Sequence, residues 1–260
     1  MKKHVIGACC RLGQKLNGVQ YGSSYFALDK VFGHNTTFDY QEFYSYHKKM
    51  GSDTNVITIG GDHSISEYTV KSSMKKKDNV HVIWIDAHAD INTESTSGSG
   101  NSHGMMVSKL LGYDSRPECL KPYNLTYVGL RDIDIPEKSI IELEKIKVYS
   151  TQNVLEYGPK HIASEIIASA ETEGDAFYHI SIDVDVIDPS YFPYTGTPVI
   201  DGLRPEYVKE LLKIFKNKTI GLDIVEFNPL VKTMGETGER LESCLEIIDS
   251  WVSVYTDLEN

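Results

Sequence analysis

Short apolar segments alternate with amphipathic segments along almost the whole chain. The apolar segments are rich in Val, Ile and aromatic residues and are bounded by Gly, Asp or Asn, which is typical of buried strands in a parallel sheet. They predict seven strands, at residues 4–9, 55–59, 81–85, 125–129, 147–149, 177–183 and 219–225. Helices are expected between them, at residues 22–32, 64–76, 136–143, 159–171, 204–215 and 239–255. This alternation predicts an α/β domain with three layers, in which helices cover both faces of a mostly parallel central sheet.

Two of these helices carry start signals. Pro205 lies in the expected first turn of the helix at 204–215, where its missing N–H costs nothing. The run from Ser64 to Glu67 resembles a capping box at the start of the helix at 64–76. No Pro/Gly/Ser-rich linker divides the 260 residues, so we expect a single domain that covers 1–260.

Composition and charge exclude several classes of protein. The apolar runs are far shorter than the roughly 18 residues that a membrane span needs, and we expect a cytoplasmic protein without membrane contact. The four cysteines form no CxxC pair, which argues against a zinc knuckle or a disulfide framework. A formal charge of -11 opposes the phosphate neutralisation on which nucleic-acid binding depends, so no nucleic-acid partner is expected.

Carboxylate and imidazole side chains gather directly after three of the predicted strands. The carboxyl ends of parallel strands lie at one edge of a sheet, where open α/β folds bind ligands, so these side chains should meet there. Positions two apart on an extended backbone face the same side, which predicts convergence within each stretch. The three stretches read Gly60-Gly61-Asp62-His63-Ser64, Asp86-Ala87-His88-Ala89-Asp90 and Ser181-Ile182-Asp183-Val184-Asp185-Val186-Ile187-Asp188-Pro189.

The combination of these stretches predicts a metal site. Each one alone is common by chance, but burying Asp86, Asp90, Asp183 and Asp185 together without cations would cost several kcal/mol per carboxylate. Oxygen ligands mixed with imidazoles, and without thiolates, favour Mn(II). Two such ions that share carboxylates would acidify a water held between them, so the chemistry expected is metal-assisted hydrolysis.

The same three stretches, GGDHS, DAHAD and SIDVDVIDP, together resemble the metal-binding signatures of the ureohydrolase superfamily, which includes the arginases. The resemblance extends from about Gly18 to about Pro229 and implies an arginase-like fold with two Mn(II) per chain. It implies six metal ligands: His63 and Asp90 on one ion, His88 and Asp185 on the other, and Asp86 and Asp183 bridging both.

Residues 90–104, DINTESTSGSGNSHG, are similar to the loop that distinguishes arginases within the superfamily. The resemblance implies that the α-carboxylate of arginine is bound, directly or through water, by Asn92, Ser97, Ser99 and Asn101. It also implies that Asp134, with Asp132 and Glu137 nearby, holds the α-ammonium group.

Three further positions match active-site residues of the family. His103 corresponds to the proton-shuttling histidine, Glu226 to the glutamate that pairs with the guanidinium, and Thr197 to a threonine close to that group. An imidazole with a pKa near 6.5 is suited to moving protons near neutral pH. The resemblance also makes Asp90 the acceptor of a hydrogen bond from the bridging hydroxide.

The resemblance therefore predicts a manganese-dependent arginase, which hydrolyses L-arginine to L-ornithine and urea by a metal-bridging hydroxide, with Asp90, His103 and Glu226 as catalytic residues. A first alternative is an agmatinase or another ureohydrolase of guanidino or formimino compounds, and urea release from arginine and agmatine would distinguish it. An alternative of another class is a catalytically weak, arginine-binding regulatory protein, which would bind arginine without releasing urea.

Three features depart from the family pattern. The segment near 33–52 is short, which predicts that an outer element of the sheet is missing. The C-terminal tail after Tyr255 is also short, which puts the family's trimer in doubt and leaves open a monomer or another homo-oligomer. Val186 stands where the family often has glycine, which should alter the local backbone more than the metal coordination.

Overall fold

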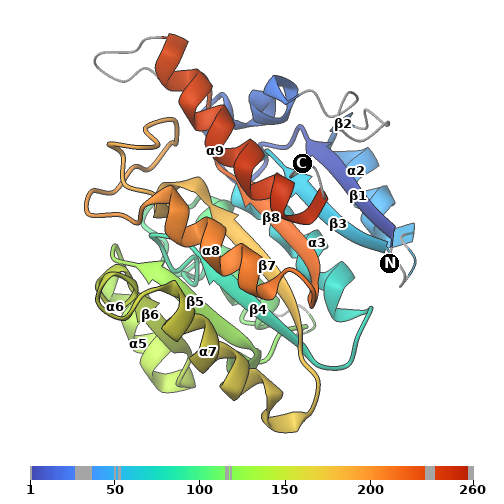
Figure 1. Cartoon of the computed structure of the whole chain (residues 1–260), viewed down its shortest axis with the longest axis vertical. Coiled ribbons are helices and arrows are strands. Elements are labelled where there is room, and N and C mark those ends of the chain that lie inside the picture. The colour runs from blue at the N-terminus through green and yellow to red at the C-terminus, as the bar shows by residue number, and fades with distance from the viewer. Residues whose placement is uncertain are drawn as a thin grey trace.

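The computed structural model describes residues 2–26, 37–49, 51, 54–114, 117, 119–231 and 238–256. Within them one sheet of eight parallel strands runs in the order β2-β1-β3-β8-β7-β4-β5-β6 (Figure 1). The strands are β1 (Lys2–Ala8), β2 (Thr37–Phe38), β3 (Thr54–Ile59), β4 (Val80–Ile85), β5 (Leu125–Leu130), β6 (Lys147–Ser150), β7 (Phe177–Asp183) and β8 (Thr219–Val225). All seven predicted strands are confirmed, and β7 and β8 have the predicted bounds.

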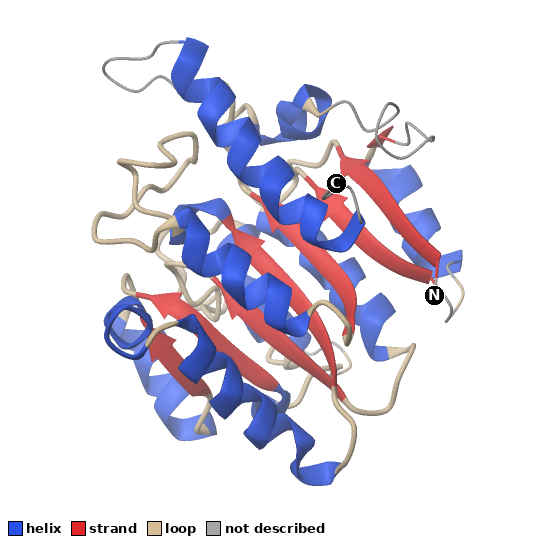
Figure 2. Ribbon diagram, viewed as in Figure 1, coloured by secondary structure: helices blue, strands red, loops and turns tan. Residues whose placement is uncertain are grey.

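Helices cover both faces of this sheet (Figure 2). The α-helices are α2 (Tyr40–Lys49), α3 (Ser66–Met74), α4 (Met106–Leu110), α5 (Ile135–Glu144), α6 (Thr151–Tyr157), α7 (Pro159–Ala170), α8 (Pro205–Phe215) and α9 (Gly238–Thr256). Short 3-10 helices are η1 (Val19–Tyr25), η2 (His63–Ile65), η3 (Ser102–Met105), η4 (Pro122–Asn124), η5 (Glu171–Glu173) and η6 (Val184–Val186). The predicted three-layer α/β/α class is therefore confirmed.

The helix predictions differ in detail from the structure. The four helices expected from residue 136 onward are present as α5, α7, α8 and α9, and Pro205 begins α8. The helix expected at 22–32 is 3-10 up to Tyr25, and residues 27–32 lie outside the described residues. The capping box expected at Ser64 is wrong, because the Asp62 side chain caps η2 by accepting from the Ser64 N–H, and α3 follows.

The expectation that an outer sheet element is missing is also wrong. β2 pairs with β1 through Gly7–Thr37 and Ala8–Phe38, and α2 follows it directly. A strand of two residues and a helix of ten fit into this short segment. The sheet therefore keeps an outer strand beyond β1.

Apolar side chains fill both spaces between sheet and helices. On the face that carries α7, α8 and α9 in Figure 1, Trp251 of α9 is fully buried and its indole N–H donates to Pro205 O at 3.2 Å. On the other face, α3, α4 and α5 pack against Trp84 and its neighbours. Every residue of β4 and β5 is buried, which explains why these strands read as continuous apolar runs rather than alternating ones.

No described helix is long and apolar enough to cross a membrane.

A buried polar cluster crosses the layer between α3 and the sheet. The His179 ring lies 3.0 Å from Asp223 Oδ2 and 2.9 Å from Ser73 Oγ, and Ser66 of α3 also contacts Asp223. Burial alone would raise the pKa of Asp223, but the charge and hydrogen bond of His179 hold that pKa below its ordinary value. Gly221 leaves room for this cluster, because a Cβ there would meet the His179 ring and lie 2.5 Å from Ser73 Oγ.

We therefore expect Gly221→Ala to lower the free energy of unfolding by about 1–3 kcal/mol, as overpacking of a filled interior does. Gly238→Ala is the matched control, since a Cβ at Gly238 meets no atom within 4 Å. Thermal unfolding followed by circular dichroism should show a melting temperature several degrees lower for the first variant than for the second. Equal melting temperatures would contradict this packing.

Candidate functional site

The first stretch of the site is a tight turn after β3. Gly60 and Gly61 adopt φ of +88° and +82°, a conformation that L side chains rarely adopt and that glycine permits, which allows the sharp turn. Gly60 N donates to Ile224 O at 2.8 Å, which ties the turn to β8. The turn delivers His63 to the carboxyl edge of the sheet, where its side chain is completely buried.

The other two stretches converge for a different reason from the one predicted. Strand β4 ends at Ile85, the chain bends from Asp86 to His88, and Asp90 adopts φ of +51°. Strand β7 ends at Asp183, and Asp185 lies in the 3-10 turn η6. The assumption of extended backbone is therefore wrong in both stretches, and turns rather than the pleat of a strand aim these side chains.

The imidazole of His63 faces three carboxylates. Its Nδ1 lies 3.2 Å from Asp86 Oδ2, 3.1 Å from Asp90 Oδ2 and 3.5 Å from Asp183 Oδ2, yet it makes no hydrogen bond. Its other ring nitrogen is 2.9 Å from Ser181 Oγ, which fixes the ring. A buried nitrogen without a hydrogen bond, surrounded by carboxylate oxygens, is the arrangement that a bound cation would complete.

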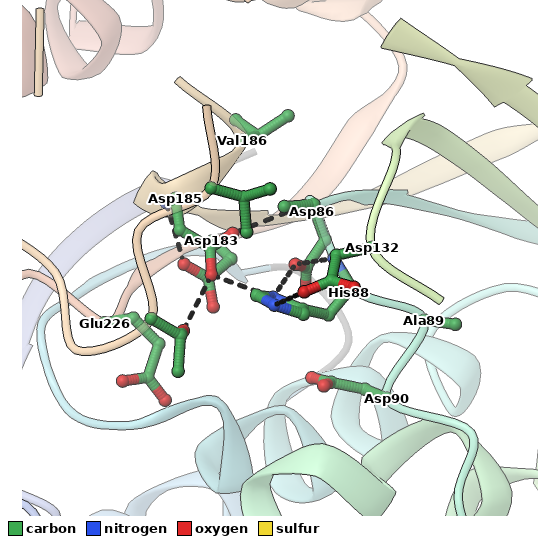
Figure 3. Close-up of polar contacts among 12 residues, drawn as sticks. Asp86, His88, Ala89, Asp90, Asp132, Asp183, Asp185, Val186 and Glu226 are labelled. Atoms are coloured by element: carbon green, nitrogen blue, oxygen red, sulfur yellow. Dashed lines mark hydrogen bonds and ion pairs between the residues drawn. The ribbon is translucent and has the colours of Figure 1, made fainter. Parts of the chain in front are cut away.

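His88 forms a second group with Asp86 and Asp185. Its Nδ1 lies 3.0 Å from Asp185 Oδ2 and 3.7 Å from Asp86 Oδ1. Figure 3 shows these side chains pointing toward one another, with Asp183 beside them. Asp86 thus turns one oxygen to His63 and the other to His88, which is the geometry that a bridging ligand needs. Both groups, His63-Asp86-Asp90 and Asp86-His88-Asp185, could hold a metal ion.

The electrostatics of this cluster are unfavourable without cations. Burial and the neighbouring Asp185 and Asp86 raise the pKa of Asp183 well above its ordinary value. Burial and Asp86 likewise raise the pKa of Asp185. A metal ion would stabilise the ionised forms of both groups, so the donors present fit a cation.

Residues around the cluster hold the candidate ligands in place. Trp84 stacks on the His63 ring at 4.1 Å and donates its indole N–H to Asp86 Oδ2 at 3.0 Å. Thr197 Oγ1 donates to Asp185 Oδ2 at 3.0 Å, so this predicted substrate residue contacts a candidate metal ligand. Trp84 was not among the predicted site residues, because a tryptophan in an apolar strand reads as core.

A cavity of about 270 Å³ opens above the cluster. It is lined by His88, Asp90, Asn92, Ser97, Gly98, Ser99, His103, Gly104, Asp132, Asp134, Glu137, Asp183 and Thr197. Of the predicted substrate residues, Asn101 and Glu226 are not in this wall. A larger cavity of about 550 Å³ lies between α2 and α3, but it holds none of the predicted site residues.

The loop that carries Asn92 lies directly against the predicted ammonium-binding residues. Asn92 Nδ2 donates to Asp134 Oδ2 at 3.0 Å. The two oxygens of Glu137 accept from the backbone N–H groups of Ile91 and Asp134, at 3.2 and 3.0 Å. Burial raises the pKa of Glu137 to about 7. These contacts support a role for Glu137 in holding the loop that carries Asn92 against the loop that carries Asp134.

The predicted serines shape their own loop. Ser97 Oγ accepts from Gly100 N and Ser99 Oγ accepts from Asn101 N, both at 3.1 Å. Both hydroxyls keep their own O–H to donate, because an acceptor bond uses only a lone pair. Ser97 and Ser99 therefore stabilise the turns of their loop and can still donate their O–H groups to a ligand.

His103 and Glu226 form a pair at the end of β8. Glu226 adopts φ of +65°, and its Oε1 accepts from His103 Nδ1 at 3.0 Å and from His63 N at 2.9 Å. Burial alone would lower the pKa of His103, but its hydrogen bond and charge interaction with Glu226 raise that pKa to about 9. Glu226 itself is buried and does not line the cavity, whereas its partner His103 does.

Comparison with known proteins decides the family. Residues 13–245 match the sequence profile of the Arginase family. The chain belongs to the arginase family. Curated arginase-family relatives include an arginase of Glaciozyma antarctica, 38% identical over 72% of this chain, and arginase-1 of Mus musculus, 36% identical over 72%. These matches cover 58% and 61% of the two relatives, so the chain spans little more than half of their length.

A solved structure supports the same arginase fold. The arginase of Entamoeba histolytica, solved in complex with L-ornithine, superimposes with a TM-score of 0.82 at 28% identity, and the match covers 98% of each chain. The arginase family is metal-dependent, and the two ligand groups described above are the candidate positions for metal in this chain.

Two polar residues that were not among the predicted site residues hold this site together. Arg131 donates to five backbone carbonyls, among them Asp185 O at 2.6 Å and Val199 O at 2.8 Å. Since a guanidinium has five N–H donors, this clamp fixes the loops beside Asp185 and Thr197. Gln14 donates from Nε2 to Glu226 Oε2 at 2.6 Å. Arg131 follows directly after β5, at the edge of the sheet where ligands are expected, so its position could have indicated a role. No sequence pattern indicates Gln14.

Val186, where arginases often have glycine, causes no strain here. It is not among the non-glycine residues with positive φ, and its side chain packs on Gly129, whose added Cβ would meet Val186 Cγ2. The neighbouring Asp185 keeps its contact with His88. A backbone compatible with L side chains explains how valine is tolerated at this position.

We expect the His103–Glu226 pair to make stability depend on pH in protein freed of metal by a chelator. The pKa of His103 is raised from 6.5 to about 9, so its contribution is fully present below pH 6.5 and is lost as pH rises through 9. Urea unfolding of the parent and of His103→Asn should therefore differ most near pH 6 and least above pH 9. A difference that stays constant from pH 6 to 9.5 would contradict the pairing.

Proposed function

We propose that this chain is a manganese-dependent arginase that hydrolyses L-arginine to L-ornithine and urea. The observation that carries the proposal is the cluster of two imidazoles and four buried aspartates beneath a cavity whose walls bear the arginase-like loop. His63, Asp86, Asp90 and Asp183 would hold one Mn(II), and His88, Asp86, Asp183 and Asp185 the other. When bound, such a pair supplies a hydroxide nucleophile near neutral pH.

The charge of the cavity favours a cationic substrate. Its described lining includes five carboxylates, those of Asp90, Asp132, Asp134, Glu137 and Asp183, and neither Lys nor Arg. L-arginine carries two cationic groups, the guanidinium and the α-ammonium, which this lining attracts. Asp134 would hold the α-ammonium, assisted by Asp132, while Glu137 keeps their loop in place.

The loop at 90–104 favours a substrate that also carries a carboxylate. Asn92, Ser97, Ser99 and Asn101 offer amide and hydroxyl donors near the acidic wall. Agmatine lacks the α-carboxylate and would leave these donors without a ligand partner. This is the physical reason for proposing arginine over agmatine.

Proton transfer would use Asp90 and His103. Asp90 lines the cavity beside the candidate metal ligands, so it would take up the proton that the nucleophile releases and pass it to the leaving amine. His103 has an 18% exposed side chain and can exchange protons between that amine and solvent. The resemblance assigns Glu226 to the guanidinium, and its contacts support a second role, the orientation of His103.

The cytoplasmic location and the assembly state stay predictions from the sequence.

The test is hydrolysis by Mn(II)-loaded protein of L-arginine and agmatine, followed as urea release, and of formimidoylglutamate, followed as formamide release. We expect kcat/KM for arginine to exceed that for agmatine at least about tenfold, because a lost charged interaction costs roughly 1.5–3 kcal/mol. Activity should disappear after chelation and return with Mn(II). Preference for agmatine would favour another ureohydrolase, and arginine binding without urea release would favour the regulatory protein.

A further inference from the structure

The carboxylate of Glu226 is held at both oxygens. Oε1 accepts from two groups of the candidate site, His63 N and His103 Nδ1. Oε2 accepts from the side-chain amide of Gln14 at 2.6 Å, a contact between residues 212 positions apart in the sequence. The terminal torsion of a glutamate is broad, so a carboxylate bound through one oxygen keeps rotational freedom. The second contact therefore fixes the plane of the Glu226 carboxylate.

The backbone next to Gln14 is itself fixed to the site. Gly13 N donates to Asp62 Oδ2 at 2.6 Å, and Gly13 O accepts from His103 N at 3.1 Å. A Cβ at Gly13 would lie 2.9 Å from the Cβ atoms of His103 and Ser64, so the chain passes in close contact with the histidine's loop. Gln14 is thus anchored to the same backbone that carries His103, and its amide is buried.

The chemical type of the residue matters as well. An amide donates a hydrogen bond without bringing a positive charge, whereas a lysine at this distance would neutralise Glu226. With Gln14 as partner, the negative charge of Glu226 stays available to His103 and to a guanidinium. If the side chain at position 14 only filled space, it would not need the N–H donor that binds Glu226.

We propose that Gln14 is a positioning residue that holds Glu226, and through it His103, in the orientation that proton transfer requires. This inference rests on the proposed function, because the reaction supplies the proton transfer in question. Gln14 itself does not line the cavity. Its effect on turnover should therefore depend on the presence of His103.

The test is a double-mutant cycle in the Mn(II)-loaded protein with Gln14→Met, which keeps an unbranched side chain of similar size and removes the donor. We expect Gln14→Met to lower kcat for arginine roughly tenfold in the parent and less than about twofold in a His103→Asn background, since residues that act through one another are not additive. Gln152→Met, the same change at an exposed position on α6, is the control and should leave kcat unchanged. Manganese content and melting temperature verify that the variants are folded.

An unchanged kcat in Gln14→Met, or an equal loss in both backgrounds, would overturn the inference while the parent's urea release still supports the proposed function. If the parent releases no urea, the proposed function fails. The Gln14–Glu226 contact is then tested by measuring the unfolding equilibria of the single and double variants. Gln14→Met and Glu226→Gln should in that case be non-additive, with a coupling of at least about fivefold in the unfolding equilibrium constant. Additive effects there would overturn the inference as well.

Discussion

Four carboxylates buried beside two imidazoles impose the constraint on which the rest of this structure depends. Removing each charge from water costs several kcal/mol unless an opposite charge or hydrogen bonds compensate. The described residues supply part of this compensation: Trp84 donates to Asp86, Thr197 donates to Asp185, and Arg131 lies close enough for its charge to interact with both. The remainder is what a pair of cations would provide. The parallel sheet makes the cluster possible, because β3, β4 and β7 all end at the same edge.

The sequence predicted the strands well and the short helices poorly. β4, β5 and β8 are buried on both faces, so their composition alone identifies them. Helix α4 has five residues and α6 has seven, and such short helices depend on tertiary packing and local caps rather than on periodicity. Ser150 caps α6 by accepting from Asn153 N, a contact that becomes evident only once the turn is formed.

The candidate site shows the same division. The residue types in the three stretches were sufficient to predict which side chains meet, because strand ends in a parallel sheet share an edge. How they meet depends on turns: Asp90 and Glu226 both adopt positive φ, which non-glycine residues rarely do and which the surrounding contacts must stabilise. Gln14 and Arg131 could not be assigned their roles, because their partners are loops that fold back from distant parts of the chain.

The central claim is that this cluster is completed by two metal ions. Calorimetric titration of Mn(II) into the chelator-treated chain, with the bound metal counted after gel filtration, tests it most directly. The account predicts two ions per chain, and loss of both in Asp86→Asn, because each oxygen of Asp86 faces a different imidazole. Binding of no manganese, or an undiminished pair of ions in Asp86→Asn, would contradict it.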